Sequence, residues 1–177
     1  MGLYFTSDPH FGHIKSFLWE PRGYTSWEEA GLATVKNYNE IITDNDVVFI
    51  LGDIMLNNDD FGIECVRQLK GKKYLAIGNH DTDARIQKFA ELNIFKEIAV
   101  GYRMRYDKYS FWCSHYPMKM GNYKEKHPTW NLSGHTHMNQ IIVPEDCIYN
   151  VGLDAHNNYP VSIEQIINDI KEYRKNV

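Results

Sequence analysis

Five short apolar runs in this sequence each end in a cluster of histidine, aspartate or asparagine. The clusters are SDPH at the end of GLYFTS, GD after DVVFIL, GNHD after KKYLAI, SHYP after YSFWC, and GHTH after WNLS. Apolar runs of this length are typical of buried β-strands. Ligand sites of open α/β sheets lie outside the carboxyl ends of their strands. The pattern therefore predicts that five strands deliver Asp, His and Asn side chains to one edge, as a metal site requires.

Amphipathic segments between and after these runs predict helices, and turn residues predict hairpins. Helices are expected over residues 26–43, 59–71, 83–93 and 162–175, with Ser26 and Ser162 as N-caps. Residues 95–117 predict two long strands joined near residues 107–108, and residues 139–152 a hairpin turning at 144–146. This βαβαβα order followed by a β-rich part predicts a layered α/β protein with one mixed sheet, or two sheets covered by helices. The length of 177 residues and 43% hydrophobic content favour a single domain over residues 1–177.

Charge, hydropathy and cysteine content exclude several classes of protein. A net charge of -4 argues against a protein that coats nucleic acid by bulk electrostatics, although a local basic patch is compatible with it. We find neither the pattern of a signal peptide nor a stretch long enough to span a membrane, so no membrane partner is expected. Cys65, Cys113 and Cys147 are odd in number and far apart, which disfavours a disulfide framework and a cysteine-based zinc site. These features favour a reducing, cytoplasmic location.

The polar clusters have a simpler explanation that does not account for all of their residues. Glycine, asparagine and aspartate are common in turns. Turn formation does not require histidine, yet histidine occurs in four of the five clusters, as His10, His80, His115, His135 and His137. Imidazole, carboxylate and amide ligands without thiolate suit Mn, Fe, Zn, Co or Ni, of which we favour Mn.

The candidate ligands are too many for one tetrahedral ion. They are Asp8, His10, Asp53, Asn79, His115, His135 and His137. Two ions ~3.5–4 Å apart that share a bridging carboxylate would use all of them. Such a pair can hold a bridging hydroxide as nucleophile and neutralise the oxygens of a phosphoryl group, which indicates phosphoester hydrolysis. A structural site for a single metal would leave several of these side chains without a role.

The same motifs, in the same order, resemble the calcineurin-like metallophosphoesterase superfamily. The similarity runs from FTSDPHFGH to NVGLD, and EPRGYTSWEE, HYPM and YPVS resemble its small bacterial and phage-type members. The resemblance implies an α/β fold, a four-layer α/β/β/α sandwich with two mixed β-sheets flanked by helices. It also implies a metal site at the carboxyl ends of the strands.

The resemblance further implies how the site residues divide their roles. One ion is expected on Asp8, His10, Asp53 and His137, and the other on Asp53, Asn79, His115 and His135, with Asp53 as the bridge. His80 resembles a histidine that contacts the scissile phosphate and protonates the leaving oxygen, and Asp81 would orient its ring. We expect residues 134–137 to be extended, so that both histidines of GHTH face the metals while Thr136 points away.

Residues that would contact the substrate are less constrained by the sequence. Phe11 and His13 are candidates to line the pocket, with a surface position as the alternative for His13. Arg22 is a candidate phosphate ligand, with a surface ion pair as the alternative. The segment 116–130 carries Lys119, Lys124 and Lys126 among aromatic residues, a composition that suits a nucleotide or a solvated loop.

The sequence thus predicts a metal-dependent phosphoric ester hydrolase with two divalent ions. We expect a phosphodiesterase in which a metal-bound hydroxide attacks a nucleotide or another phosphodiester, and nucleic acid is a possible substrate. The alternatives are a phosphomonoesterase or protein phosphatase of the same fold, and a non-catalytic scaffold that retains the fold. The oligomeric state does not follow from the sequence.

Overall fold

Two five-stranded mixed sheets form the framework of the protein. A computed structural model describes residues 1–120 and 126–175. The first sheet has the strand order β10-β1-β2-β3-β4. Its strands are β1 (Leu3–Thr6), β2 (Val47–Ile50), β3 (Lys72–Ala76), β4 (Glu97–Ala99) and β10 (Val161–Ser162). The strands β1 to β4 are parallel, and β10 is antiparallel to β1.

The second sheet is built by the β-rich part of the chain. Its strand order is β5-β6-β7-β9-β8. The strands are β5 (Gly101–Tyr106), β6 (Tyr109–Ser114), β7 (Thr129–Ser133), β8 (Ile142–Val143) and β9 (Ile148–Asn150). The strands β6, β7 and β9 are parallel, so their carboxyl ends point in one direction.

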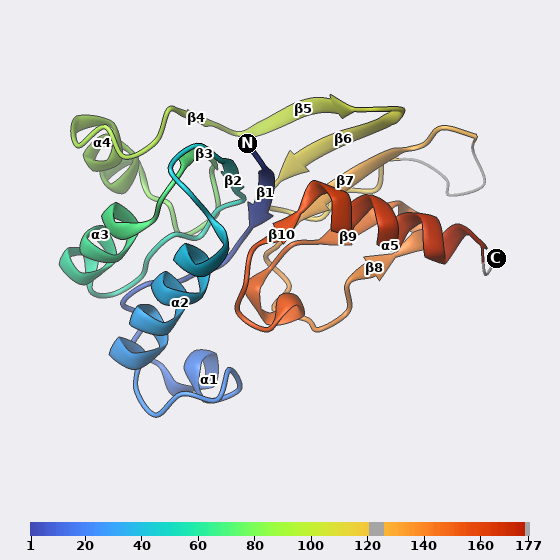
Figure 1. The fold of residues 1–177 in the computed structure, drawn as a ribbon. Coiled ribbons are helices and arrows are strands. Elements are labelled where there is room, and N and C mark those ends of the chain that lie inside the picture. Colours follow the sequence, from blue (N-terminus) through green and yellow to red (C-terminus); the bar gives the residue numbers. More distant parts are fainter. Residues whose placement is uncertain (121–125, 176–177) are drawn as a thin grey trace.

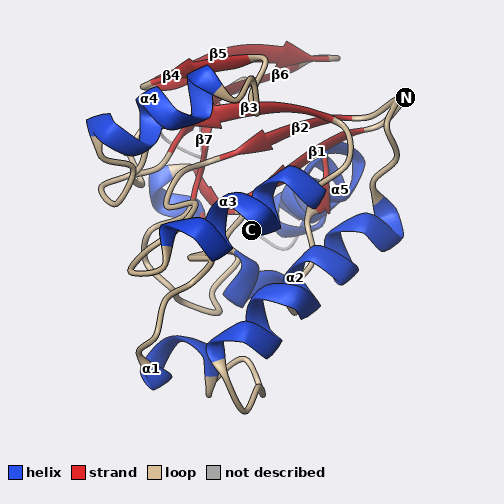
Figure 2. Ribbon diagram, turned by 90° about the vertical axis from the view of Figure 1, so that its left-hand side faces the viewer, coloured by secondary structure: helices blue, strands red, loops and turns tan. Residues whose placement is uncertain are grey.

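The described part of the chain contains five helices. They are α1 (Ser16–Trp19), α2 (Trp27–Ile41), α3 (Asp59–Gln68), α4 (Asp83–Glu91) and α5 (Ile163–Lys175), and the 3-10 turns η1 (Pro144–Asp146) and η2 (Leu153–His156) lie in the connections. Figure 1 shows α2 and α3 on one side of β1 and α5 on the other, and Figure 2 shows α2 and α3 running side by side. These views agree with the predicted pair of mixed sheets flanked by helices, which is confirmed.

Two apolar cores hold these layers together. One core contains Val35 and Tyr38 of α2, Val66 of α3, and Val48 and Ile50 of β2, so it joins the helices to the first sheet. The other core joins both sheets to α5. Its members include Phe5, Leu51, Phe111, Trp130, Leu132, Tyr149, Ile163, Ile166 and Ile170. Because the second core fixes the two sheets against each other, it also fixes the relative positions of the strand ends that carry the polar clusters.

The N-terminal cap of α2 forms largely as its sequence predicts. The Ser26 hydroxyl accepts a hydrogen bond from the backbone N–H of Glu29 at 3.2 Å. The Glu29 carboxylate, however, accepts from the backbone and hydroxyl of Thr25 instead of from Ser26. The reciprocal bond of the capping box is therefore displaced by one residue.

Two predicted element boundaries are wrong. The long strand expected from residue 95 is divided, because β4 belongs to the first sheet and β5 to the second, and the chain crosses between them at Val100. The helix expected to end at Gly71 ends at Gln68, since Leu69 is already extended, with φ -70° and ψ 124°. Within residues 1–120 and 126–175, none of the helices is both long enough and apolar enough to cross a membrane.

Candidate metal centre

Strand ends from both sheets deliver the candidate ligands to one place. Asp8 and His10 follow β1, Asp53 follows β2, and Asn79 follows β3 of the first sheet, while His115 follows β6 and His135 and His137 follow β7 of the second. Backbone hydrogen bonds hold neighbouring loops together, for example from Asp8 N–H to the Gly52 carbonyl at 3.1 Å. The expected ligands thus converge, although two of them, His10 and His137, are 127 residues apart in the sequence.

The first group of ligands consists of Asp8, His10 and His137, whose ligand atoms lie close enough to share one ion. The Nε2 atoms of His10 and His137 are 3.1 Å apart. Asp8 Oδ1 lies 3.7 Å from His10 Nε2 and 3.9 Å from His137 Nε2. Two ligands on ~2.1 Å metal bonds at a right angle are separated by ~3 Å, so the two imidazoles have a spacing that a shared ion accounts for.

The second group consists of Asp53, His115 and His135, with Asn79 beside them. His115 Nε2 lies 3.1 Å from His135 Nδ1, 2.9 Å from Asn79 Oδ1 and 3.5 Å from Asp53 Oδ2. The other ring nitrogen of His115, Nδ1, lies 2.8 Å from the Leu51 carbonyl oxygen. Because only a protonated Nδ1 can donate to a carbonyl, the neutral form of this ring has its Nε2 lone pair directed into the cluster.

A single oxygen of Asp53 lies between the two groups. Asp53 Oδ2 is 3.6 Å from His10 Nε2 and 3.5 Å from His115 Nε2. The second oxygen, Oδ1, accepts a hydrogen bond from the His80 backbone N–H at 2.8 Å. The carboxylate is therefore fixed with one oxygen directed at both clusters, which is the placement that a bridging ligand needs.

A buried, unpartnered oxygen of Asp8 shows that these residues suit a cation. Asp8 Oδ2 accepts from the His135 backbone N–H at 2.8 Å, whereas Oδ1 is buried and has no hydrogen-bond partner within residues 1–120 and 126–175. An unpaired carboxylate oxygen in the interior is costly unless it binds a cation. Burial raises the pKa of Asp8, but the adjacent His10, His115 and His137 outweigh this effect and lower it, so the group stays ionised. Burial lowers the pKa of His10 and of His135, which favours the neutral rings that bind metal.

Five of the candidate ligands have a left-handed backbone conformation. Their φ angles are 60° for Asp8, 47° for His10, 56° for Asp53, 70° for His135 and 51° for His137. This region is unfavourable for residues with a Cβ and persists where the surrounding structure imposes it. It also corrects one expectation, because β7 ends at Ser133 and residues 134–137 are not extended. The two histidines reach the two ligand groups through turns instead of through the alternation of a strand.

Gly134 lies where the loop after β7 passes closest to β1. A Cβ atom at this position would overlap Asp8 Oδ2 and the Ser7 hydroxyl. We expect Gly134→Ala to displace Asp8, to lower stability by about 1–3 kcal/mol through overpacking and to weaken metal binding. Thermal unfolding and metal titration measure both effects. Thr136→Ala in the same loop is the control, because Thr136 is exposed. Unchanged unfolding and metal affinity in Gly134→Ala would contradict this role.

Arg22 belongs to a buried ion pair in the wall of a cavity beside the first ligand group. Its Nε and one terminal nitrogen donate to the Asp154 carboxylate at 2.7 and 3.0 Å, and the same terminal nitrogen donates to the Asp8 carbonyl at 3.0 Å. The Arg22 side chain is only 5% exposed. The phosphate contact stays a prediction, whereas the surface location expected for the alternative ion pair is wrong.

Asp154 is a residue of the site that the sequence analysis did not identify. Asp154 Oδ2 accepts a hydrogen bond from His137 Nδ1–H at 2.8 Å, and this bond raises the pKa of His137. The pKa of Asp154 is lowered, because its hydrogen bonds to His137 and Arg22 outweigh the effect of burial. The carboxylate thus fixes the His137 ring with Nε2 facing the first ligand group. Asp154 is the last residue of NVGLD and lies in the turn η2 after β9; the family resemblance includes this motif but gave the carboxylate no role.

Replacing Asp154 with asparagine tests this positioning. The amide keeps the shape but removes the charge opposite Arg22 and weakens the bond to His137. Residues that orient metal ligands typically contribute about 10–100-fold to metal affinity, and we expect a loss of that size. Metal titration of the refolded, metal-free protein measures it. Asp146→Asn is the matched control, because Asp146 also forms an ion pair, with Lys119. Wild-type affinity in Asp154→Asn would contradict the role.

Asp81 holds the backbone of the site in place and, contrary to the expectation, does not contact the His80 ring. Its carboxylate accepts backbone N–H groups from Asp53 at 2.9 Å, Ile54 at 3.0 Å and Gly78 at 2.8 Å. These bonds tie the loop after β2 to the loop after β3, and burial raises the pKa of this carboxyl. In the structure Asp81 therefore positions the backbone of two loops, in place of the predicted orientation of the His80 ring.

His80 lies at the rim of the centre, next to both ligand groups. Its Nε2 is 3.9 Å from Asp53 Oδ2, and its ring packs edge-on against His10 with the centroids 5.4 Å apart. The Arg85 guanidinium donates to the His80 carbonyl at 2.7 Å and holds the backbone in place. The side chain is 38% exposed, so a substrate that approaches the centre from solvent can reach the ring.

The remaining candidates for substrate contact are Phe11, His13 and the lysines of residues 116–130. Phe11 is 1% exposed and belongs to the core beneath the first sheet, so the prediction that it lines the pocket is wrong. His13 packs edge-on against His10 at 5.8 Å, beside the first ligand group. Of the lysines in residues 116–130, Lys119 pairs with Asp146 and Lys126 lines a pocket that contains none of the candidate metal ligands. Lys124 lies outside the described residues.

An open cavity adjoins the first ligand group. Its volume is about 660 Å³, and its walls include His137 and Asp154 together with Tyr24, Asn139 and Asn157. The cavity is lined mainly by polar groups, which suits a charged or hydrogen-bonding substrate.

Most of the chain matches the model of a known protein family. The model of the calcineurin-like phosphoesterases matches residues 1–146. This range includes every candidate metal ligand and ends before Asp154 and α5.

Relatives of known sequence and structure extend the similarity along the chain. An uncharacterized protein of Methanocaldococcus jannaschii is 30% identical over an alignment of 177 positions, which covers 96% of this chain and 92% of that protein. The gene 66 protein of Mycobacterium phage L5 is 29% identical over an alignment of 166 positions, which covers 78% of this chain and 79% of the phage protein. The crystal structure of a protein of unknown function from Aquifex aeolicus has a TM-score of 0.72 at 22% identity and covers 94% of this chain and 98% of that one. This last similarity shows a shared fold.

Proposed function

Because this chain belongs to the calcineurin-like phosphoesterase family, we propose that it hydrolyses phosphodiesters with two divalent metal ions. The observation that carries this proposal is the position of Asp53 Oδ2, which lies 3.6 Å from His10 Nε2 and 3.5 Å from His115 Nε2. One carboxylate oxygen directed at two groups of imidazoles is the arrangement that a pair of ions requires. A single-ion site would leave one group without a cation.

The proposed division of ligands follows the two groups in the structure. Asp8, His10 and His137 would hold one ion and Asn79, His115 and His135 the other, with Asp53 shared. When bound, such ions activate water and neutralise charge on the phosphoryl oxygens. A donor set of imidazole, carboxylate and amide without thiolate suits Mn, Fe, Zn, Co or Ni, and of these we favour Mn. A cytoplasmic location would keep the three buried cysteines reduced.

His80 is the proposed proton donor to the leaving oxygen. Its ring is partly exposed and lies beside the oxygen that we assign as the bridge. A histidine is suited to this role because its ordinary pKa is close to neutrality. Asp81 supports the reaction indirectly, because it fixes the backbone amides of Asp53 and Gly78.

A phosphodiester, such as that of a nucleotide, is the substrate that we favour. The side chains of His80 and His137 are 38% and 35% exposed, so the centre opens to solvent. A diester can place its two substituents on either side of such an opening, with one substituent in the polar cavity beside His137.

Hydrolysis of two synthetic esters tests the proposal. We expect the manganese-loaded protein to turn over bis-p-nitrophenyl phosphate, a diester, and to lose this activity after treatment with a chelator. Restoration by added Mn is the control for damage by the chelator. Preference for the monoester p-nitrophenyl phosphate would identify a phosphomonoesterase instead. No turnover of either ester, in protein shown to contain two ions, would indicate a scaffold that retains the fold.

A further inference from the structure

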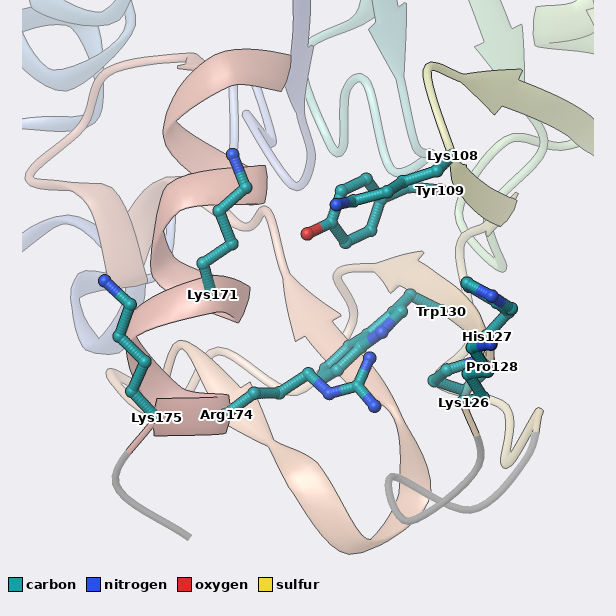
Figure 3. A pocket seen from close by; sticks show the side chains of 9 residues that line it. All are labelled: Lys108, Tyr109, Lys126, His127, Pro128, Trp130, Lys171, Arg174 and Lys175. Atoms are coloured by element: carbon teal, nitrogen blue, oxygen red, sulfur yellow. The ribbon is translucent and has the colours of Figure 1, made fainter.

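A second pocket lies at the opposite end of the second sheet from the metal centre. Its volume is about 450 Å³, and Figure 3 shows the nine side chains that line it. Tyr109 begins β6 and Pro128 precedes β7, whereas His115 and His135 follow the other ends of the same strands. Six residues of strand span roughly 20 Å, so a ligand in this pocket does not touch the metal ligands.

The rim of this pocket is strongly basic although the whole chain is acidic. Five of the 19 Lys and Arg residues line it, and no Asp or Glu is among its lining residues. They are Lys108, Lys126, Lys171, Arg174 and Lys175. The described lysines that form ion pairs, Lys36, Lys88 and Lys119, lie elsewhere. The four lysines of the rim therefore keep their charges available for an anion.

These charges come from three separate parts of the chain. Lys108 lies in the β5–β6 turn, Lys126 precedes β7, and the others lie on α5. Basic residues in the last turn of a helix also stabilise its dipole, which explains Arg174 and Lys175 by themselves. That effect does not explain Lys108 or Lys126. The part of the rim on α5 also lies beyond the residues that match the family model.

The pocket has an apolar centre in addition to its charge. Figure 3 shows the rings of Tyr109 and Trp130 between the basic side chains of α5 on one side and Lys126 and His127 on the other. Trp130 and Pro128 are buried, while Tyr109 is partly exposed and can contact a ligand. The indole N–H of Trp130 has no hydrogen-bond partner among the described residues. An aromatic surface within a cationic rim suits a flat organic group that carries phosphates.

We propose that this pocket binds a nucleotide with more than one phosphate, with its base near Tyr109 and its phosphates on the lysines of the rim. The same chemistry is offered by a free nucleoside diphosphate and by the phosphorylated end of a nucleic-acid strand. The volume lies within the range of about 300–1,000 Å³ that is usual for pockets of small ligands. The site is separate from the metal centre, so it stands whether or not the protein hydrolyses phosphodiesters.

Nuclear magnetic resonance of the full-length, zinc-loaded protein tests this site. We expect ADP to shift the backbone amide signals of Tyr109 and Trp130 and the indole N–H signal of Trp130. Inorganic pyrophosphate, which has the charge without the base, should bind more weakly. A 5′-phosphorylated tetranucleotide in a third titration distinguishes the end of a strand from a free nucleotide, according to which of the two binds more tightly.

Two double variants test whether the lysines of the pocket rim bind the phosphates of ADP. Loss of two charge-assisted contacts to phosphate should weaken ADP binding about tenfold or more in Lys108→Ala combined with Lys171→Ala. Lys36→Ala combined with Lys70→Ala removes the same charge elsewhere and should bind as the wild type. Hydrolysis of bis-p-nitrophenyl phosphate should be unchanged in both. ADP shifts confined to the residues around His115 and Gly134, equal losses in the two double variants, or pyrophosphate binding as tight as ADP would each overturn the proposal.

Discussion

Replacing His80 with alanine is expected to abolish most turnover while leaving the metal content unchanged. The ring of His80 is 38% exposed, and its Nε2 lies 3.9 Å from Asp53 Oδ2 without belonging to the proposed ligand set. Removing a general acid typically costs about 10²–10⁴-fold in rate. The backbone N–H of His80, which donates to Asp53 Oδ1, remains in the variant. Steady-state kinetics and elemental analysis of the same sample measure the two quantities.

The leaving group makes this test specific for a proton donor. A p-nitrophenolate is weakly basic and needs little help to depart, whereas an alkoxide needs a proton. The loss in His80→Ala should therefore be larger for a diester with an alkyl leaving group than for bis-p-nitrophenyl phosphate. His127→Ala, which removes an exposed histidine far from the centre, serves as the control. Full activity of His80→Ala on both esters would contradict the assignment.

Replacing Asp53 with asparagine is expected to remove both metal and activity. The amide has a single neutral oxygen, and the hydrogen bond from the His80 N–H is available to occupy it. Its NH2 group would then point toward His10 and His115, in the place of Oδ2. An amide NH2 group donates hydrogen bonds and has no free lone pair, so it cannot bind a cation in that position.

The effect of this substitution on metal affinity should exceed that of Asp154→Asn. Loss of a residue that only orients a ligand typically costs about 10–100-fold, and a shared ligand affects both ions. Elemental analysis after dialysis measures the loss, with Asp44→Asn, an exposed carboxylate, as the control. Retention of two ions with normal activity would show that Asp53 is not the bridge.

The positions of the candidate ligands could be predicted from the sequence because each of them follows a strand. Each candidate lies within a few residues of the carboxyl end of an apolar run, and parallel strands bring such ends together. The second core, through residues such as Phe5 and Leu132, then sets the two sheets face to face. Hydrophobic patterning and local propensity were enough to predict the strand ends, whereas the choice of two sheets over one came from the family resemblance.

Contacts between distant loops could not be predicted in the same way. Asp154 is 17 residues from His137 and 132 from Arg22, and nothing in its local sequence distinguishes it from a turn residue. Asp81 has three backbone partners that only the packing of two loops creates. The left-handed conformations of Asp8 and His135 are likewise imposed by their surroundings and not by their residue types.

Titration of the metal-free protein with manganese, followed by electron paramagnetic resonance, tests the proposed centre most directly. We predict two Mn ions per chain, with a spectrum of exchange-coupled ions, because Asp53 would connect the two groups. The coupling should disappear in Asp53→Asn. Binding of a single ion, or of two ions with independent spectra, would contradict a shared dinuclear centre.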